Sequence, residues 1–174
     1  MSVEGASADF EGAIEGVKRY LKRLSDRFED IKLHGEGGRF QLYLQERGLG
    51  RVSATRLSDG TLRFLCLMAV LCDPKPGPLV CIEEPEAGLH PDALALVGDA
   101  LREASTRTQL IVTTHSDALV DRFTDQPESV VVCERDFDEG TCFRRLSSEK
   151  LNEWLEEYTL GDLWRRGEIG GTKR

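Results

Sequence analysis

No run of apolar residues in this chain of 174 residues is long enough to cross a membrane. The longest run, residues 64–72, reaches about half of the ~20 residues that a membrane-spanning helix needs. Residues 1–10 contain neither a basic start nor an apolar core, so the sequence predicts no secretory signal peptide. We therefore expect a soluble, cytoplasmic protein without a membrane partner.

Cysteine chemistry is also limited. The cysteines are five in number and form no C-x-x-C pair, which disfavours a disulfide framework or a zinc knuckle. They are Cys66, Cys72, Cys81, Cys133 and Cys142. Most of them lie among apolar neighbours, and this pattern predicts reduced, buried thiols.

A uniformly basic surface for nucleic acid is not expected, because the net charge is -8 and the pI is about 5.0. Lysines and arginines still gather at residues 18–27, 144–145 and 165–166, and we interpret these clusters as solvated helix or strand faces. With 40% hydrophobic residues the chain can bury a core, and its length suits a single domain.

The order of the apolar patterns predicts an α/β fold. Apolar residues at three- and four-residue steps from Ile14 to Ile31 indicate an amphipathic helix over 10–31. Strands that alternate with helices in the middle of the chain indicate a layered fold with a mainly parallel sheet. The other expected elements are a strand at 40–45, helices at 58–72, 91–105 and 117–123, buried parallel strands at 79–83 and 110–113, a hairpin of 130–134 and 142–146 that turns at 138–140, and a helical tail from Ser147 or Ser148.

We expect one domain, 1–174, with three parts. These are a helical segment (1–35), a core that holds the chemical motifs (36–146) and a helical tail (147–174).

Two adjacent carboxylates, Glu83 and Glu84, end the first of the parallel strands. Because side chains alternate along a strand, these two point in different directions. One can bind Mg²⁺ while the other holds a water for attack, and nucleotide hydrolysis needs this division of labour. Taken alone, the motif also fits a loop with solvated glutamates.

Two further motifs lie at the ends of neighbouring elements. His115 follows the second parallel strand, and the carboxyl ends of parallel neighbours share one crevice. Ser58 and Gly60 open the helix at 58–72, where a hydroxyl and free backbone amides form an anion site. A structural histidine and an ordinary helix cap are the alternatives.

The order of these motifs resembles the C-terminal half of an ATP-binding-cassette (ABC)-type ATPase head. LSDGTLRFL (57–65) is similar to the signature motif, LVCIEEPEAGLHP (79–91) to the Walker B strand and D-loop, and IVTTHS (111–116) to the switch-histidine segment. IEEPE, GLHP and the tail from Tyr158 resemble the AAA-labelled, SMC-like branch that includes the overcoming-lysogenization-defect (OLD)-like ATPases. The resemblance covers residues from about 40 to 174 and implies part of a P-loop NTPase-like three-layer fold.

The resemblance also implies two groups of site residues. The first group serves the chemical step: Glu84 would polarise the attacking water, Glu83 would accompany Mg²⁺ and His115 would sense the γ-phosphate. The second group would contact ATP held by an opposing subunit, or cross to that subunit, and comprises Ser58, Asp59, Gly60 and His90.

The phosphate-binding (Walker A) loop, G-x-x-x-x-G-K-[ST], is missing from these residues. No Gly-Lys dipeptide occurs, and the glycine-rich stretches at 35–38, 48–50 and 170–171 do not fit the pattern. We therefore expect this chain to use ATP and Mg²⁺ only when an N-terminal half or a partner ATPase subunit supplies that loop. The expected assembly is a homo- or heterodimer of heads.

Two other hypotheses stay open. A chain without a phosphate-binding loop can be a catalytically inactive module that docks a partner ATPase. A metal-dependent nuclease or hydrolase could use Glu83, Glu84, Glu86, His90 and His115, although no H-E-x-x-H spacing occurs. The resembling branch includes DNA-repair, DNA-structuring and phage-defence ATPases, so DNA and nucleases are expected classes of partner.

Overall fold

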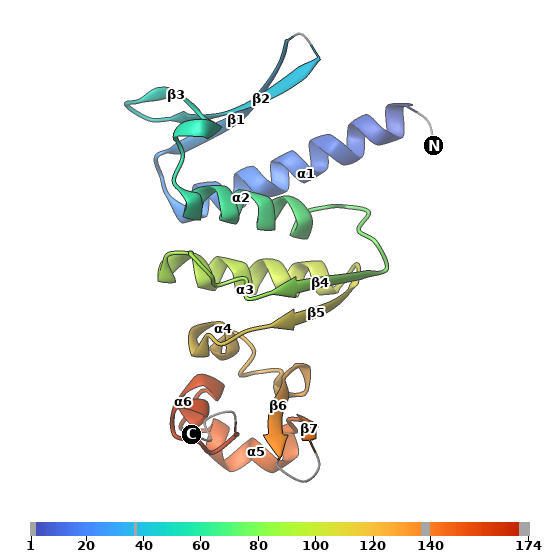
Figure 1. Cartoon of the computed structure of the whole chain (residues 1–174), viewed down its shortest axis with the longest axis vertical. Coiled ribbons are helices and arrows are strands. Elements are labelled where there is room, and N and C mark those ends of the chain that lie inside the picture. Colours follow the sequence, from blue (N-terminus) through green and yellow to red (C-terminus); the bar gives the residue numbers. More distant parts are fainter. Residues whose placement is uncertain (1–2, 37, 137–139, 171–174) are drawn as a thin grey trace. The chain divides into compact units, whose positions relative to one another are not determined.

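The computed structural model describes residues 3–36, 38–136 and 140–170, and it shows an α/β protein (Figure 1). The chain divides into two compact units, Met1–Thr113 and Thr114–Arg174. Our prediction of one domain over 1–174 stays a prediction, because compact units can belong to one domain. The two units are described separately.

The first unit contains three helices, a three-stranded antiparallel sheet and a pair of parallel strands. The helices lie between the antiparallel sheet and the parallel pair (Figure 1). In chain order the elements are α1 (Val3–Leu24), β1 (Phe28–Glu36), β2 (Arg39–Glu46), β3 (Gly50–Ser53), the 3₁₀ helix η1 (Ala54–Arg56), α2 (Asp59–Leu71), β4 (Leu79–Glu83), α3 (Pro91–Ser105) and β5 (Gln109–Thr113).

The predicted helix over 10–31 is wrong in its last part. Helix α1 ends at Leu24, and Phe28 and Ile31 belong to strand β1. Ile31 lies opposite Leu44 of β2, so it belongs to the apolar face of the antiparallel sheet. The three-residue step from 28 to 31 also fits a helix, and in β1 a register shift between Phe28 and Asp30 interrupts the two-residue strand period.

The predicted strand at 40–45 is confirmed as β2, which pairs with both β1 and β3. Its apolar face is covered at one end, where Leu44 is fully buried. At the other end Phe40 is 83% exposed, so the far part of the hairpin extends beyond the core. The half-exposed character that the alternation predicted is therefore confirmed.

The core of the first unit forms where the three helices meet. Each helix places large apolar side chains on the face that contacts the others, as its helical period requires. The buried members include Val17, Tyr20, Leu21, Phe64, Leu65, Met68, Leu71, Leu94, Val97 and Leu101. The predicted helices at 58–72 and 91–105 are confirmed within a residue of each end, because Ser58 and Pro91 mark their starts.

Strands β4 and β5 are parallel, and Glu83 lies opposite Thr113 at their carboxyl ends. Their positions and parallel direction confirm the predicted strands at 79–83 and 110–113. The prediction that these strands are buried is wrong. Leu79 is 47% exposed and Ile111 is 50% exposed, whereas we expected buried strands. A parallel strand is buried when further strands and helices cover both of its faces, and within the described residues this sheet has two strands.

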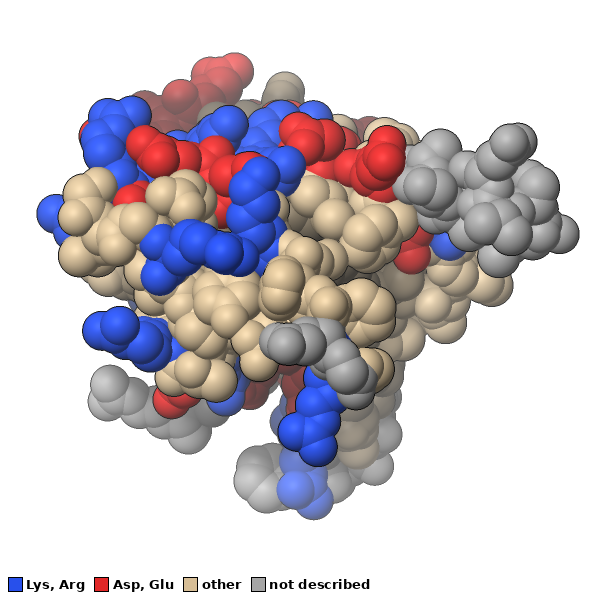
Figure 2. Space-filling view, turned by 90° about the horizontal axis from the view of Figure 1, so that it is seen from above, with Lys and Arg blue, Asp and Glu red and all other residues tan. Residues whose placement is uncertain are grey.

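The cationic segment of α1 is largely ion-paired. Lys18 contacts Asp30 on β1, Arg19 contacts Glu103 and Arg23 contacts Asp99, the last two on α3. Figure 2 shows acidic and basic side chains beside one another in the upper part of the face it presents. We interpreted residues 18–27 as a solvated face. The ion pairs show that three of these cations also join α1 to β1 and α3.

Tyr20 is buried and donates a hydrogen bond to Glu103 Oε2 at 3.0 Å. Burial, and then this carboxylate, raise the pKa of Tyr20 from 10.0 to about 12. A neutral phenol with a higher pKa in the folded state stabilises the protein below pH 10, and this contribution is lost as the pH rises through 12.

We therefore expect Tyr20→Phe to lower the free energy of unfolding by about 1 kcal/mol near neutral pH, since it removes one hydrogen bond. Between pH 10 and 12 the wild type should lose more stability than the variant, so their difference should narrow or reverse. Urea unfolding followed by circular dichroism across this pH range measures both effects. A constant difference at all pH values would contradict the titration.

The second unit is a small α/β layer around its own core. Its elements are α4 (Asp117–Asp121), η2 (Pro127–Ser129), β6 (Val131–Asp136), β7 (Gly140–Arg145), α5 (Ser148–Leu155) and α6 (Leu160–Arg165). The core side chains are Val120, Leu146, Leu160, Leu163 and Ile169. The predicted hairpin is confirmed as β6 and β7, and residues 138–139 of its predicted turn lie outside the described residues.

No disulfide joins the five cysteines, all of which lie in the described part of the chain. The prediction that they are buried is wrong for Cys66, Cys81 and Cys133, which are exposed. Their apolar neighbours misled the prediction, because Cys81 and Cys133 lie on the exposed side of strands whose other side is half-buried. Within the described residues, no helix combines the length and apolar character needed to span a membrane.

Candidate functional site

The signature-like segment forms the start of helix α2. Ser58 is the N-cap, and its Oγ accepts a hydrogen bond from the backbone N–H of Thr61 at 3.2 Å. Ser58 and Asp59 are exposed, so a hydroxyl and the first turn of a helix face solvent. This start has the positive end of the helix dipole, a property that favours an anionic ligand.

The acidic pair lies at the carboxyl end of β4, and both carboxylates are exposed. Glu83 is the last residue of the strand. Glu84 still donates its backbone N–H to Thr113 O of β5 at 2.9 Å, and its φ of 43° then turns the chain away from the sheet. Among the described residues other than glycine, it alone has a positive φ. That the two side chains point in different directions stays a prediction.

The loop after Glu84 is compact. The N–H of Ala87 donates to Glu84 O, and the N–H of Leu89 donates to Glu86 O, both at 3.0 Å. Pro85 is buried. These contacts define an acid loop, residues 84–89, between β4 and α3.

The start of α2 and the acid loop touch each other inside the first unit. A Cβ atom placed on Gly60 would lie 2.8 Å from the carbonyl oxygen of Gly88, so only glycine fits at position 60 without a shift. Arg63 Nη1 donates a hydrogen bond to Ala87 O at 3.1 Å. The structure therefore brings together two motifs that the sequence predicted separately.

Arg63 itself was missed by sequence reasoning. It lies inside the signature-like segment, but its residue type carried no separate signal, because an exposed arginine on a helix is normally solvated. The sequence did offer Gly88 as a clue, because a glycine in a loop favours a sharp turn and leaves room for a neighbour. In the structure its φ is +73°.

His90 has a structural position. It is the N-cap of α3, and its Nδ1 accepts a hydrogen bond from Asp92 N at 3.3 Å. The imidazole is largely exposed. Its predicted contact with a nucleotide stays a prediction, and Nδ1 is already engaged by the cap.

His115 follows β5 by two residues and belongs to the second unit, just before the α4 cap Ser116. Its side chain is exposed. The residue before the unit boundary, Thr113, lies opposite Glu83 in the parallel register. The convergence of His115 on the acidic pair stays a prediction.

Within the described residues, no group of three or more His, Cys, Asp or Glu side chains could hold a metal ion by themselves. Glu83 nevertheless fits Mg²⁺, since this ion prefers carboxylate oxygen and is usually bound through one or two carboxylates, water and substrate phosphates. An exposed carboxylate at a strand end has the right donor chemistry for such a partial site.

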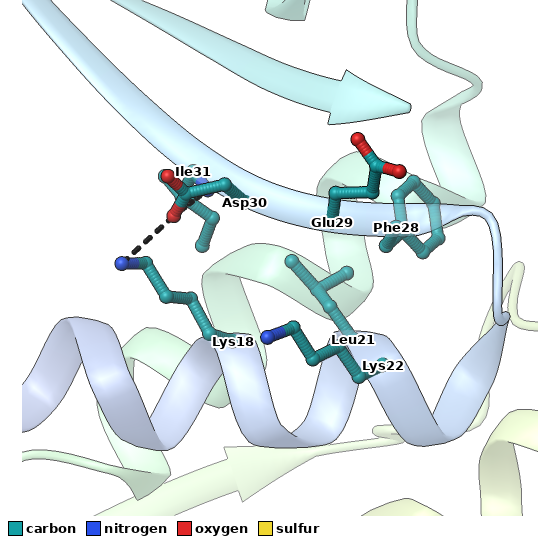
Figure 3. A pocket seen from close by; sticks show the side chains of 7 residues that line it. All are labelled: Lys18, Leu21, Lys22, Phe28, Glu29, Asp30 and Ile31. Carbon is teal, nitrogen blue, oxygen red and sulfur yellow. Dashed lines mark hydrogen bonds and ion pairs between the residues drawn. The ribbon is translucent and has the colours of Figure 1, made fainter. Parts of the chain in front are cut away.

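A shallow depression lies elsewhere in the first unit, between α1 and β1 (Figure 3). It is lined by Lys18, Leu21, Lys22, Phe28, Glu29, Asp30 and Ile31. The ammonium groups of Lys18 and Lys32 hold the pKa of the Asp30 carboxyl well below its ordinary value. Salt-bridged side chains fill this place, so we assign it to packing of α1 on the sheet.

The fold is that of part of an SMC ATPase head, an AAA/ABC-type P-loop NTPase fold, and in this chain the signature-like start of α2 packs against the acid loop that follows β4. More particularly, the chain belongs to the family described as "AAA domain, putative AbiEii toxin, Type IV TA system", which matches residues 10–121. It is thus an ATPase-type domain. No curated protein sequence matches the chain.

Solved structures share the fold. One, from "Structural biochemistry of ATP-driven dimerization and DNA stimulated activation of SMC ATPases", has a TM-score of 0.61 and 22% identity, covering 85% of this chain and 91% of that one. The Smc head bound to the C-winged helix domain of ScpA has a TM-score of 0.66 and 21% identity, covering 83% of this chain and 45% of that one. The Smc head with an extended coiled coil bound to the C-terminal domain of ScpA, from Pyrococcus furiosus, has a TM-score of 0.65 and 22% identity. That match covers 85% of this chain and 38% of that one. The chain spans less than half of the last two structures.

Proposed function

We propose that this chain binds and hydrolyses ATP as the C-terminal half of an ABC-type head, at a composite site whose phosphate-binding loop comes from another polypeptide segment. Glu84 polarises the attacking water and Glu83 accompanies Mg²⁺. His115 senses the γ-phosphate of the same nucleotide. The residues that contact the nucleotide of an opposing head, or cross to it, are Ser58, Asp59, Gly60 and His90.

The observation that carries this proposal is the packing of the α2 start against the acid loop. Phosphoryl transfer depends mainly on positioning and charge stabilisation, so the contacting groups must be held on rigid elements. Here a helix N-terminus and a strand-end carboxylate are held together through Gly60, Gly88 and Arg63. Solvated glutamates on an unrelated loop have no need of such a contact.

The chain's own residues supply three parts of the chemistry. Glu84 is exposed at the end of β4, where its carboxylate can accept a proton from a water and orient it. The Ser58 hydroxyl, whose oxygen accepts from Thr61 N, still has a proton that it can donate to an anionic group, and the first amides of α2 can donate to the same group. When bound, Mg²⁺ neutralises charge on the phosphate oxygens.

The open parallel pair supports a second polypeptide segment. Among the described residues neither β4 nor β5 has a further strand neighbour, and Leu79 and Ile111 are about half exposed. Parallel sheets normally have more strands and covered faces. A segment that adds strands and the phosphate-binding loop would meet both needs. The dimer is further supported by the ATP-driven dimerisation described for the SMC ATPases among the similar structures. Their DNA-stimulated activation makes DNA the favoured class of partner.

The test measures binding of a fluorescent ATP analogue with Mg²⁺, first to the chain alone and then with a separately produced N-terminal ATPase half. We expect weak binding by the chain alone and at least about tenfold tighter binding with the complement, a gain of about 1.4 kcal/mol. ATP hydrolysis should appear only in the mixture. Tight binding by the chain alone would contradict the composite site, and binding of the complement without hydrolysis would favour the inactive docking module.

A further inference from the structure

Arg63 is an exposed side chain on the second turn of α2, and it reaches across to the acid loop. Its Nη1 donates to Ala87 O at 3.1 Å. Its stem and guanidinium also lie beside Gly88, because a Cβ on that glycine would be 3.4 Å from both Cδ and Nε of Arg63. One side chain thus contacts two consecutive residues of the loop.

The acid loop needs such support. Glu84 has a φ of 43°, and left-handed backbone is unfavourable for residues that carry a Cβ. Apart from Pro85, the loop residues are exposed or half-buried, so little apolar packing holds them. Surrounding contacts must therefore maintain the conformation that presents the Glu84 carboxylate.

The loop and the helix start are joined at two adjacent points. Gly60, on the first turn of α2, lies against the carbonyl of Gly88 from one side. Arg63, one turn later, binds the carbonyl of the preceding residue, Ala87. The α2 start and the acid loop therefore share two contacts one helical turn apart.

We infer that Arg63 is a positioning residue, which fixes the acid loop and with it the orientation of Glu84 relative to the α2 start. This inference rests on the proposed function for its catalytic consequence. Its structural part, the clamping of the loop, stands on the contacts of Arg63 alone. Arg63 couples the helix start that would contact nucleotide to the carboxylate that would polarise water.

The first experiment measures hydrogen exchange in the chain by itself. In Arg63→Ala we expect the amides of Ala87 and Leu89 to exchange about three- to tenfold faster, since a hydrogen bond from a charged donor is lost. The amides of β4 and β5 should keep their rates. Arg56→Ala, which removes an exposed arginine from the neighbouring η1 helix, is the matched control and should leave the loop unchanged.

The second experiment measures steady-state ATP hydrolysis after complementation. Arg63→Ala should lower kcat about tenfold with little change in KM, because the variant loses orientation of the water-polarising group and keeps the nucleotide contacts. Arg63→Lys should recover part of the rate, since an ammonium group can still donate to Ala87 O. A variant that merely loosens the fold would show no such recovery.

The two experiments separate the two ideas. Unchanged loop exchange in Arg63→Ala overturns the positioning role, whatever the enzyme does. Faster exchange together with a lower kcat and recovery by lysine supports it. Faster exchange in a protein that hydrolyses no ATP under any complementation supports the clamp and overturns the proposed function.

Discussion

Glu84→Gln should reduce ATP turnover by the complemented ATPase by about a hundredfold or more. Glutamine keeps the size of the side chain and its hydrogen-bonding oxygen, but it cannot accept the proton of the attacking water. Because Glu84 is exposed at the end of β4, the neutral side chain costs little folding energy. The change should therefore act on the chemical step, with kcat lowered and nucleotide binding retained.

The measurement combines single-turnover hydrolysis with binding of the ATP analogue and size-exclusion analysis of the complex. Glu11→Gln, an exposed change of the same kind on α1, is the control and should keep full turnover. Since the bound ATP is no longer converted to ADP and phosphate, the Glu84 variant should hold ATP and its partner longer than wild type does. Undiminished turnover in Glu84→Gln would remove Glu84 from the catalytic role.

The sequence predicts the middle of the chain well because its signals are local. Ser58 and Pro91 fix helix starts, and the Pro-rich stretch at 74–78 fixes a helix end before β4. The order of these elements was enough to place Glu83 at a strand end, and the family match agrees with the resemblance.

Other features depend on contacts between distant residues, and local pattern does not encode them. Phe28 and Ile31 continue the apolar spacing of α1, yet pairing with β2 places them in a strand. The exposure of Leu79 and Ile111 depends on which other elements cover the sheet, which the residues themselves do not specify.

The candidate site shows the same division. The residue types of Glu84 and Ser58 indicate chemistry, so they could be proposed from sequence. The clamp by Arg63 could not, because it requires the approach of α2 to the acid loop, seen only in the contact of Gly60 with Gly88. A motif predicts which groups react, and the packing around it determines how they are held.

Gly161→Ala should lower the free energy of unfolding of the second unit by about 2–3 kcal/mol. This figure combines the cost of a steric clash with that of a weakened hydrogen bond. Gly161 is the second residue of α6, where that helix packs on α4, and its N–H donates to Asp121 Oδ1 at 2.6 Å. An added Cβ would clash with the same oxygen and would lie 2.7 Å from the backbone oxygen of Asp117. The Asp121 side chain could rotate away, but the Asp117 carbonyl is part of a helix and cannot.

Tryptophan fluorescence isolates this effect, because both tryptophans of the chain, Trp154 and Trp164, belong to the second unit. The urea midpoint of that signal should fall in Gly161→Ala. Gly12→Ala is the matched control, since a Cβ at Gly12 meets nothing within 4 Å and alanine favours the α1 helix. It should leave the tryptophan midpoint in place. An unchanged midpoint in Gly161→Ala would mean that α6 can move away from α4 without loss, and the close approach would then contribute nothing to the stability of the unit.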